Sequence, residues 1–150
     1  MRTRDAKFID AVMNHPDVYP WITDDGCPDA MSIHDYVSND KIYFVSPNEY
    51  TIFALFPVNS VTWEIHTCIL KPGRGKTAIE SEQKMIEYMF TQTPCKKLIS
   101  WVPEPYKHVL KYALMNGLKI EGKIEKSYLK YGELQDLTLV GITKGDWSCH

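Results

Sequence analysis

Glu64 and His66 are the residues whose types and spacing best suit proton transfer, because they stand two positions apart in the stretch 61–70. The stretch is rich in β-branched and other apolar residues, which predicts a β-strand. Strand side chains alternate between two faces, so Glu64 and His66 should be neighbours on one face. A carboxylate beside an imidazole can act as a general base. The alternative is the solvated face of a half-exposed antiparallel sheet, which shows the same alternation.

A glycine-rich turn after this strand is a candidate anion site. It spans residues 71–77 with the sequence Lys-Pro-Gly-Arg-Gly-Lys-Thr and precedes a predicted helix. The first turn of a helix presents free backbone N–H groups and the positive end of the helix dipole, and glycine lets an anion approach closely. Arg74 and Lys76 would add positive charge. The alternative is a basic, solvated turn without a ligand.

Two common nucleotide-binding motifs are excluded at this turn. The GxxxxGK pattern of the Walker A motif would need a glycine at position 70, which holds Leu70. A dinucleotide-binding fingerprint needs a preceding parallel βαβ unit, and no such unit is predicted before residue 71. The turn therefore favours neither a nucleoside triphosphate nor a dinucleotide.

Tyr112 and His108 form a third set of candidates, on a later predicted helix. The prolines in residues 103–105 predict the start of this helix, and Gly117 predicts its end. Tyr112 and His108 are four residues apart and share one helix face. Tyr112 could donate a proton as a general acid or pack against the core, and His108 could assist it or be solvated.

The elements that must position these groups follow from hydrophobic periodicity. The expected elements are a helix over 4–12, an ordered loop over 17–29, a helix over 32–37, a hairpin of 41–45 and 49–58, a strand over 61–70, a helix over 77–90, a strand over 97–102, the helix that Gly117 ends, and a hairpin of 118–129 and 137–143. Thr77 is expected to cap its helix in a capping box with Glu80. Trp21 and Trp101 are expected to be core or loop anchors.

This order predicts an α/β (α+β) fold with a mixed, mostly antiparallel sheet flanked by helices. The 150 residues have no linker long enough to divide two domains, so residues 1–150 are expected to form a single domain.

Charge and cysteine content narrow the classes of function. Residues 1–70 hold four basic and ten acidic side chains, whereas residues 71–150 hold thirteen and nine. The second part therefore suits a phosphate-bearing ligand, but the balance gives no strong nucleic-acid signal. The four cysteines include no C-x-x-C pair and no histidine at zinc-finger spacing, so no metal site is expected. No apolar run approaches the ~20 residues of a membrane span, and no signal peptide is recognisable, so a cytoplasmic protein is expected.

The element order and the glycine-rich turn together resemble the GNAT acyltransferase superfamily. In that family an Arg/Gln-x-x-Gly-x-Gly/Ala loop opens a helix and holds the pyrophosphate of acetyl-CoA, and residues 74–79, Arg-Gly-Lys-Thr-Ala-Ile, take its place here. Residues 112–118, Tyr-Ala-Leu-Met-Asn-Gly-Leu, are similar to the family's Tyr-x-x-x-Gly-Phe helix end. The resemblance covers about residues 41–143.

The resemblance implies an N-acyltransferase that moves an acetyl group from acetyl-CoA to a small-molecule or protein amine. It implies Glu64 as the base, directly or through water, with His66 as second candidate and Tyr112 as the acid for the departing thiolate. It also implies that the strand ending near Leu70 splays from the one starting near Lys97 and that the pantetheine enters there. The implied cofactor contacts are Cys68, Ile69, Leu70, Gly73, Arg74, Gly75, Lys76 and Thr77.

More narrowly, the chain resembles GNAT-like proteins of short-tailed bacteriophages. The resemblance lies in two stretches of the sequence. The first is residues 15–22, His-Pro-Asp-Val-Tyr-Pro-Trp-Ile, and the second is the C-terminal stretch that begins with residues 128–132 and ends with residues 141–145. It implies an alternative function as a non-catalytic virion or head-assembly protein, with phage structural proteins as partners, in the host cytoplasm or the virion.

Residues that depart from the GNAT pattern favour one of these two functions, and residues that keep it favour the other. Thr77, Ile79 and Ala113 replace residues that the family's motifs prefer, which favours the non-catalytic alternative. Glu64 and the turn residues 74–76 are retained, which favours the enzyme.

Overall fold

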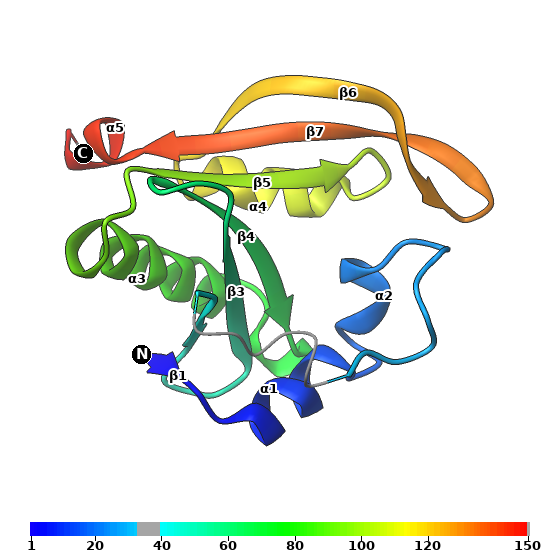
Figure 1. The fold of residues 1–150 in the computed structure, drawn as a ribbon, viewed down its shortest axis with the longest axis horizontal. Coiled ribbons are helices and arrows are strands. Elements are labelled where there is room, and N and C mark those ends of the chain that lie inside the picture. The colour runs from blue at the N-terminus through cyan, green and yellow to red at the C-terminus, as the bar shows by residue number, and fades with distance from the viewer. Residues whose placement is uncertain (33–39, 150) are drawn as a thin grey trace.

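A seven-stranded sheet with helices on both faces forms the protein, seen here in a computed structural model that describes residues 1–32 and 40–149 (Figure 1). The strands lie in the order β1-β2-β3-β4-β5-β7-β6. Their bounds are β1 Arg2–Thr3, β2 Ile42–Val45, β3 Thr51–Pro57, β4 Thr62–Ile69, β5 Lys97–Pro103, β6 Lys119–Lys130 and β7 Glu133–Thr143. The helices are α1 Ala6–Met13, α2 Tyr19–Ile22, α3 Lys76–Gln92, α4 Lys107–Met115 and α5 Lys144–Ser148.

All neighbouring strands in this sheet are antiparallel except β4 and β5, so the predicted mixed, mostly antiparallel architecture is confirmed. The short elements β1, α2 and α5 were not predicted, because two to five residues carry too little periodicity. The helix expected over 32–37 lies outside the described residues. Among the helices that are described, none has the length and apolar character needed to cross a bilayer.

The parallel pair β4 and β5 separates part-way along its length. Only residues 62–64 of β4 pair with residues 97–99 of β5. At the point of separation, the Ser100 hydroxyl donates a hydrogen bond of 3.2 Å to the Ile65 carbonyl. Beyond it, β4 stays paired with β3 and β5 stays paired with β7. The two strands therefore open like a V, which confirms the predicted splay.

Two hydrophobic clusters hold the helices on opposite faces of the sheet. The first joins α3 and α4 to the face that carries Phe53, Leu55 and Ile65. The second joins α1 to the face that carries Ile52 and Cys68. Because Ile65 and Cys68 belong to opposite faces of β4, the strand alternates regularly, as the sequence predicted.

The segment that contains α2 is fixed to the far end of the β6–β7 hairpin (Figure 1). The buried Lys130 ammonium donates to the carbonyls of Pro20 and Thr23 at 2.6 and 2.7 Å. The Asp25 carboxylate accepts the N–H groups of Tyr131 and Gly132 in the hairpin turn. Residues 17–29, expected to be an ordered loop, are therefore anchored by contacts with residues more than a hundred positions away.

Helix α3 begins at Lys76, with Gly75 as its N-cap, so the expected capping by Thr77 is wrong. Residues 71–73 form a 3₁₀ turn, and Gly75 then adopts a φ of +90°, a value that favours glycine. This glycine turns the chain into the helix before Thr77 is reached. Gly117, with a φ of +92°, follows α4 as the sequence predicted.

Candidate functional site

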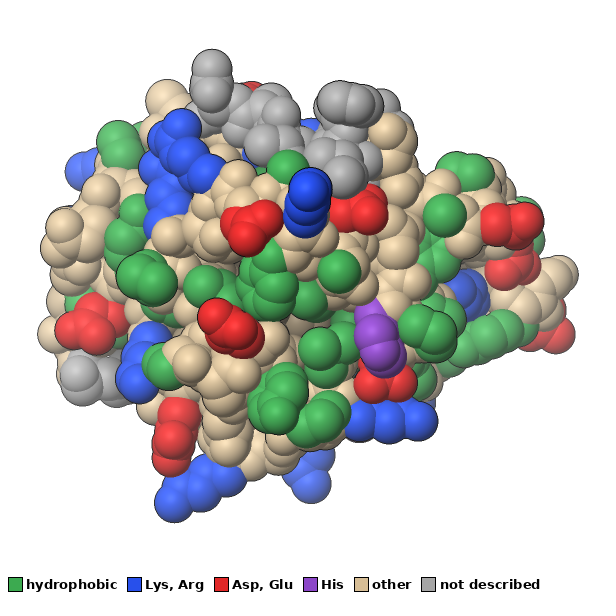
Figure 2. Space-filling view, turned by 90° about the horizontal axis from the view of Figure 1, so that it is seen from below, with side chains coloured by type: hydrophobic (Ala, Val, Ile, Leu, Met, Phe, Trp, Pro, Cys, Tyr) green, Lys and Arg blue, Asp and Glu red, His purple; other side chains and the backbone are tan. Residues whose placement is uncertain are grey.

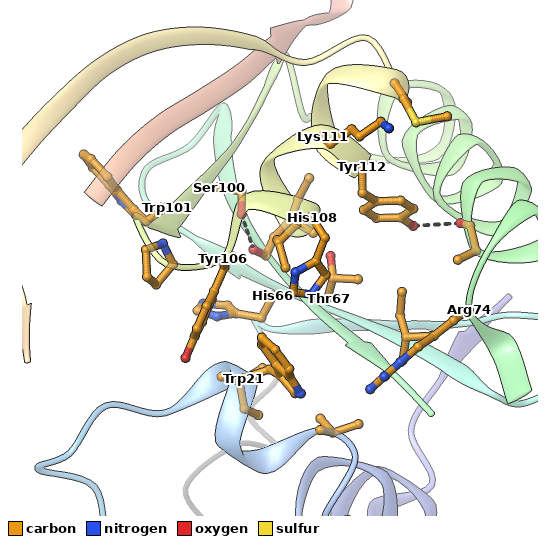
Figure 3. Close-up of a pocket in the computed structure, with 18 of the residues that line it drawn as sticks. Trp21, His66, Thr67, Arg74, Ser100, Trp101, Tyr106, His108, Lys111 and Tyr112 are labelled. Carbon is orange, nitrogen blue, oxygen red and sulfur yellow. Dashed lines mark hydrogen bonds between the residues drawn. The ribbon is translucent and has the colours of Figure 1, made fainter. Parts of the chain in front are cut away.

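A cavity of about 720 Å³ passes through the opening between β4 and β5 (Figure 3). Glu64 and His66 line it from the sheet face that carries α1, while Ile65 and Thr67 line it from the opposite face. Helices α2, α3 and α4 also contribute walls. The opening in the sheet therefore places side chains from both faces in a single cavity.

Glu64 and His66 lie together in the wall of this cavity, as their spacing predicted. The Glu64 Oε1 and His66 Nε2 atoms are 3.5 Å apart, and the two side chains are 27% and 32% exposed. The His66 ring also packs on the Phe56 ring, with centroids 4.8 Å apart. Burial lowers the pKa of His66, while the Glu64 carboxylate opposes that shift. The imidazole is therefore neutral near pH 7 and able to accept a proton.

The N-terminus of α3 forms what we call the amide end of the cavity, lined by Arg74, Gly75 and Lys76. The N–H groups of Gly75, Lys76 and Thr77 donate to no acceptor among the residues that the structure describes. The Arg74 guanidinium donates to the Asp17 carbonyl at 3.0 Å. Three unused amides beside two cationic side chains can bind an anion such as a phosphate.

Asp17 helps to fix this end of the cavity. Its carboxylate accepts the Lys71 N–H at 3.0 Å, and the Lys71 ammonium lies 3.8 Å from it. The hydrogen bond from the Lys71 amide is the main cause that lowers the pKa of Asp17, and nearby positive charges add to the shift. Asp17 therefore stays ionised and is committed to the glycine-rich turn.

Gly73 differs from the other predicted members of the anion site. It is buried, and its N–H already donates to the Leu70 carbonyl at 2.9 Å. A Cβ atom at this position would lie only 2.6 Å from the Tyr50 Cβ atom. The Gly73 amide is therefore already used within the turn, and the lack of a side chain lets the turn pack closely against Tyr50 and Thr51.

Of the predicted backbone contacts, those of Cys68 and Leu70 point towards β3, whereas Ile69 lies in the cavity wall. The Cys68 side chain is buried in the α1 cluster, where burial raises its pKa to about 12. The Leu70 N–H donates to the Tyr50 carbonyl. The alternation along β4 instead directs the backbone groups of Thr67 and Ile69 towards the opening, and both residues line the cavity. Thr67 was missed because the sequence does not show where two parallel strands separate.

Tyr112 lines the cavity, but its hydroxyl is engaged with α3 (Figure 3). It donates to the Ala78 carbonyl at 2.7 Å, and burial together with the neighbouring Glu82 raises its pKa. Glu82 is itself fully buried and accepts the Asn116 amide at 2.7 Å. Burial raises the pKa of Glu82 to about 8, because no cation offsets the loss of water. Tyr112 therefore packs α4 against α3 in this structure.

The opposite side of the cavity is aromatic, and the sequence did not predict it. We call Trp21, Trp101 and Tyr106 the aromatic end (Figure 3). The Trp21 ring makes edge contacts with Tyr106 and with His108, both at 4.9 Å between centroids. In Figure 3, Trp101 and Tyr106 lie on one side of the cavity and Arg74 on the other, with Trp21 and His66 between them. The three aromatic residues come from separate segments, so no local motif marks them.

Comparison with known proteins gives a family and a fold. A family model described as a protein of unknown function, DUF2824, matches residues 5–149. The chain belongs to this family. A comparison with curated proteins finds no match.

The solved structures that resemble this member of DUF2824 include acetyltransferases. Spermidine N-acetyltransferase from Vibrio cholerae, solved in complex with CoA and spermine, matches with a TM-score of 0.78 and 18% identity over 96% of this chain and 92% of that chain. Spermidine/spermine N-acetyltransferase SpeG from the same organism, solved with manganese ions, matches with a TM-score of 0.75 and 16% identity over 99% and 94%. At these identities the likeness shows the fold, which is the GNAT fold. In the DUF2824 protein, no described group of three or more His, Cys, Asp and Glu residues could hold a metal ion.

Proposed function

We propose that the protein is an N-acetyltransferase that transfers an acetyl group from acetyl-CoA to an amine. One observation carries the proposal: a single cavity joins the free amides at the start of α3 to the Glu64–His66 pair. An anion-binding end and a proton acceptor are the two parts that this reaction needs. The fold shared with spermidine N-acetyltransferases supports the assignment.

The residues at the amide end and in the opening offer partners for the two polar parts of CoA, its diphosphate and its pantetheine. The amides of residues 75–77, with Arg74 and Lys76, would hold the diphosphate. The backbone groups of Thr67 and Ile69 would hold the pantetheine in the opening between β4 and β5. When bound, acetyl-CoA supplies an acetyl group that is activated as a thioester.

Glu64 is the residue that accepts the proton from the substrate ammonium, directly or through water. A free amine is the nucleophile, so this proton must leave before the amine can attack. His66 lies 3.5 Å from Glu64 and is neutral near pH 7, so it can share the proton. Tyr112 would have to leave the Ala78 carbonyl to act as an acid, so we assign it a packing role.

The alternative remains a non-catalytic bacteriophage virion or head-assembly protein. Its support lies in the sequence, in the departures at Thr77, Ile79 and Ala113 and in the phage-like stretches. We favour the enzyme because the free amides of α3 and the Glu64–His66 pair lie in one cavity, as the reaction requires. Residues 1–150 as a single domain and a cytoplasmic location fit both functions.

The test is calorimetric titration of acetyl-CoA into the wild-type protein and the Arg74→Ala variant. Loss of a charge-assisted contact to the diphosphate should weaken binding about ten- to hundredfold. Lys84→Ala, which removes an exposed cation further along α3, is the matched control and should bind as the wild type does.

Three results bear on the proposal. Micromolar binding that Arg74→Ala weakens would support it, together with acetyl transfer to an amine. Absence of binding at millimolar acetyl-CoA would refute the cofactor and favour the non-catalytic alternative. Binding that Arg74→Ala leaves unchanged would keep the cofactor and overturn the assignment of its diphosphate to the amide end.

A further inference from the structure

We infer that the acceptor is a small amine with one ammonium group on an aromatic body, an arylalkylamine, and not a polyamine. The inference rests on the proposed function, because it assigns the second substrate of the same cavity. It is carried by the aromatic end and by the charges that line the cavity.

The aromatic end offers ring faces to an occupant of the cavity. Trp21 is 38% exposed although its ring touches Tyr106 and His108, so part of the indole surface faces the cavity space. Trp101 lines the same end from β5. Aromatic walls bind a second aromatic ring by stacking or edge contacts, and they also attract an ammonium group. This end therefore suits a planar apolar body that carries a cation.

The described lining of the cavity has one carboxylate, that of Glu64, which can pair with an ammonium group. Among the described lining residues the carboxylates are Asp17 and Glu64. Asp17 is already bound to the amide and the ammonium of Lys71. The Glu64 carboxylate lies 3.5 Å from the neutral His66, and the cation of Lys41 lies over the Phe56 ring on the neighbouring strand. An ammonium group taken out of water needs such a partner, so the cavity can pair one positive charge.

A polyamine would meet the wrong charges in this cavity. Its several ammonium groups would need several carboxylates, whereas Arg74, Lys76 and Lys111 also line the wall. On the described part of the face seen in Figure 2, acidic side chains lie among basic and hydrophobic ones. The fold is shared with spermidine N-acetyltransferases, but the charges of this cavity select against their substrate.

The experiment compares the binding of tryptamine and spermine by calorimetry in the presence of saturating CoA. Tryptamine should bind at least about tenfold more tightly than spermine. Trp21→Ala should weaken tryptamine binding about tenfold, and Trp21→Phe, which keeps an aromatic ring, should restore most of the loss. Leu134→Ala, which shortens an exposed apolar side chain outside the cavity lining, is the control and should bind tryptamine as the wild type does.

Each outcome separates this inference from the proposed function. Spermine binding as tight as tryptamine binding, or no tryptamine binding at all, would overturn the inference while CoA binding upheld the cofactor. Tryptamine binding that Trp21→Ala leaves unchanged would overturn the role of the aromatic end. Tryptamine binding without any binding of CoA would support the amine site and refute the acetyltransferase.

Discussion

The two ends of the cavity recognise ligands with different parts of the chain. The amide end presents backbone N–H groups of three consecutive residues, and its cations Arg74 and Lys76 come from the same turn. The aromatic end presents side chains from α2, from β5 and from the residue before α4. A substitution changes a side chain but leaves a backbone amide in place. Substitutions can therefore remove every side-chain contact of the aromatic end, whereas at the amide end they can remove the cations Arg74 and Lys76 but not the three backbone amides.

The largest effect should come from Glu64→Gln, at the boundary between the two ends. The amide keeps the shape of the side chain but cannot accept a proton, so acetyl transfer should fall about 10²- to 10⁴-fold. Binding of acetyl-CoA should not change, because the groups assigned to the diphosphate are the amides of residues 75–77 with Arg74 and Lys76, and not Glu64. Steady-state kinetics measures the rate of acetyl transfer, and calorimetry on the same preparation measures the affinity for acetyl-CoA. Glu133→Gln, at an exposed position, is the control. A loss of CoA affinity equal to the loss of rate would show that the two ends are not separable.

The next effect should come from Lys130→Met, which tests the aromatic end alone. The change leaves the buried Thr23 carbonyl without its donor, which should lower the free energy of unfolding by about 2–3 kcal/mol. Trp21 fluorescence should shift towards the red as α2 loosens. Urea unfolding measures the first effect, and Lys126→Met, on an exposed lysine of the same strand, should change neither. If Lys130→Met weakened acetyl-CoA binding as strongly as tryptamine binding, the amide end and the aromatic end would both depend on the contacts of Lys130.

A third effect, on the pH dependence of stability, should come from Glu82→Gln on α3, the helix that begins at the amide end. The pKa of Glu82 is about 8 in the folded state against an ordinary value of 4.5, so the folded state holds its proton more tightly. This group makes the wild type less stable as pH rises from 4.5 to about 8, and the loss is complete above that range. Glu82→Gln should remove this dependence and gain stability relative to the wild type as pH rises.

Urea unfolding at a series of pH values checks this prediction. The exposed Glu87→Gln on the same helix is the matched control, and its difference from the wild type should not rise with pH over this range. A stability difference between Glu82→Gln and the wild type that stayed constant from pH 5 to pH 9 would show that Glu82 keeps an ordinary pKa when folded.

The sequence correctly predicted the features that depend on residues close together in the chain. The alternation along β4 placed Glu64 beside His66, and the turn at 71–77 placed free amides at a helix start. The N-cap of α3 was misplaced because Gly75, with a φ of +90°, turns the chain into the helix two residues before Thr77.

The aromatic end could not be predicted, because its members meet only in three dimensions. Trp21 and Trp101 were expected to be anchors, since an isolated tryptophan in a sequence is most simply a packing residue. Trp21 reaches the cavity because Lys130 and Asp25 hold its segment against the β6–β7 hairpin. A contact across more than a hundred residues leaves no periodic signal in the chain.

The bond from Lys130 to the Thr23 carbonyl also sets an order of assembly. The two residues are 107 positions apart, so closing that loop carries a large entropic cost until the strands between them have paired. The free amides of residues 75–77 belong to the first turn of α3 and can form with that helix. The aromatic end of the cavity is therefore expected to be the last part of the protein to fold and the first to open. Its amide protons should exchange with solvent sooner than those of β3 and β4.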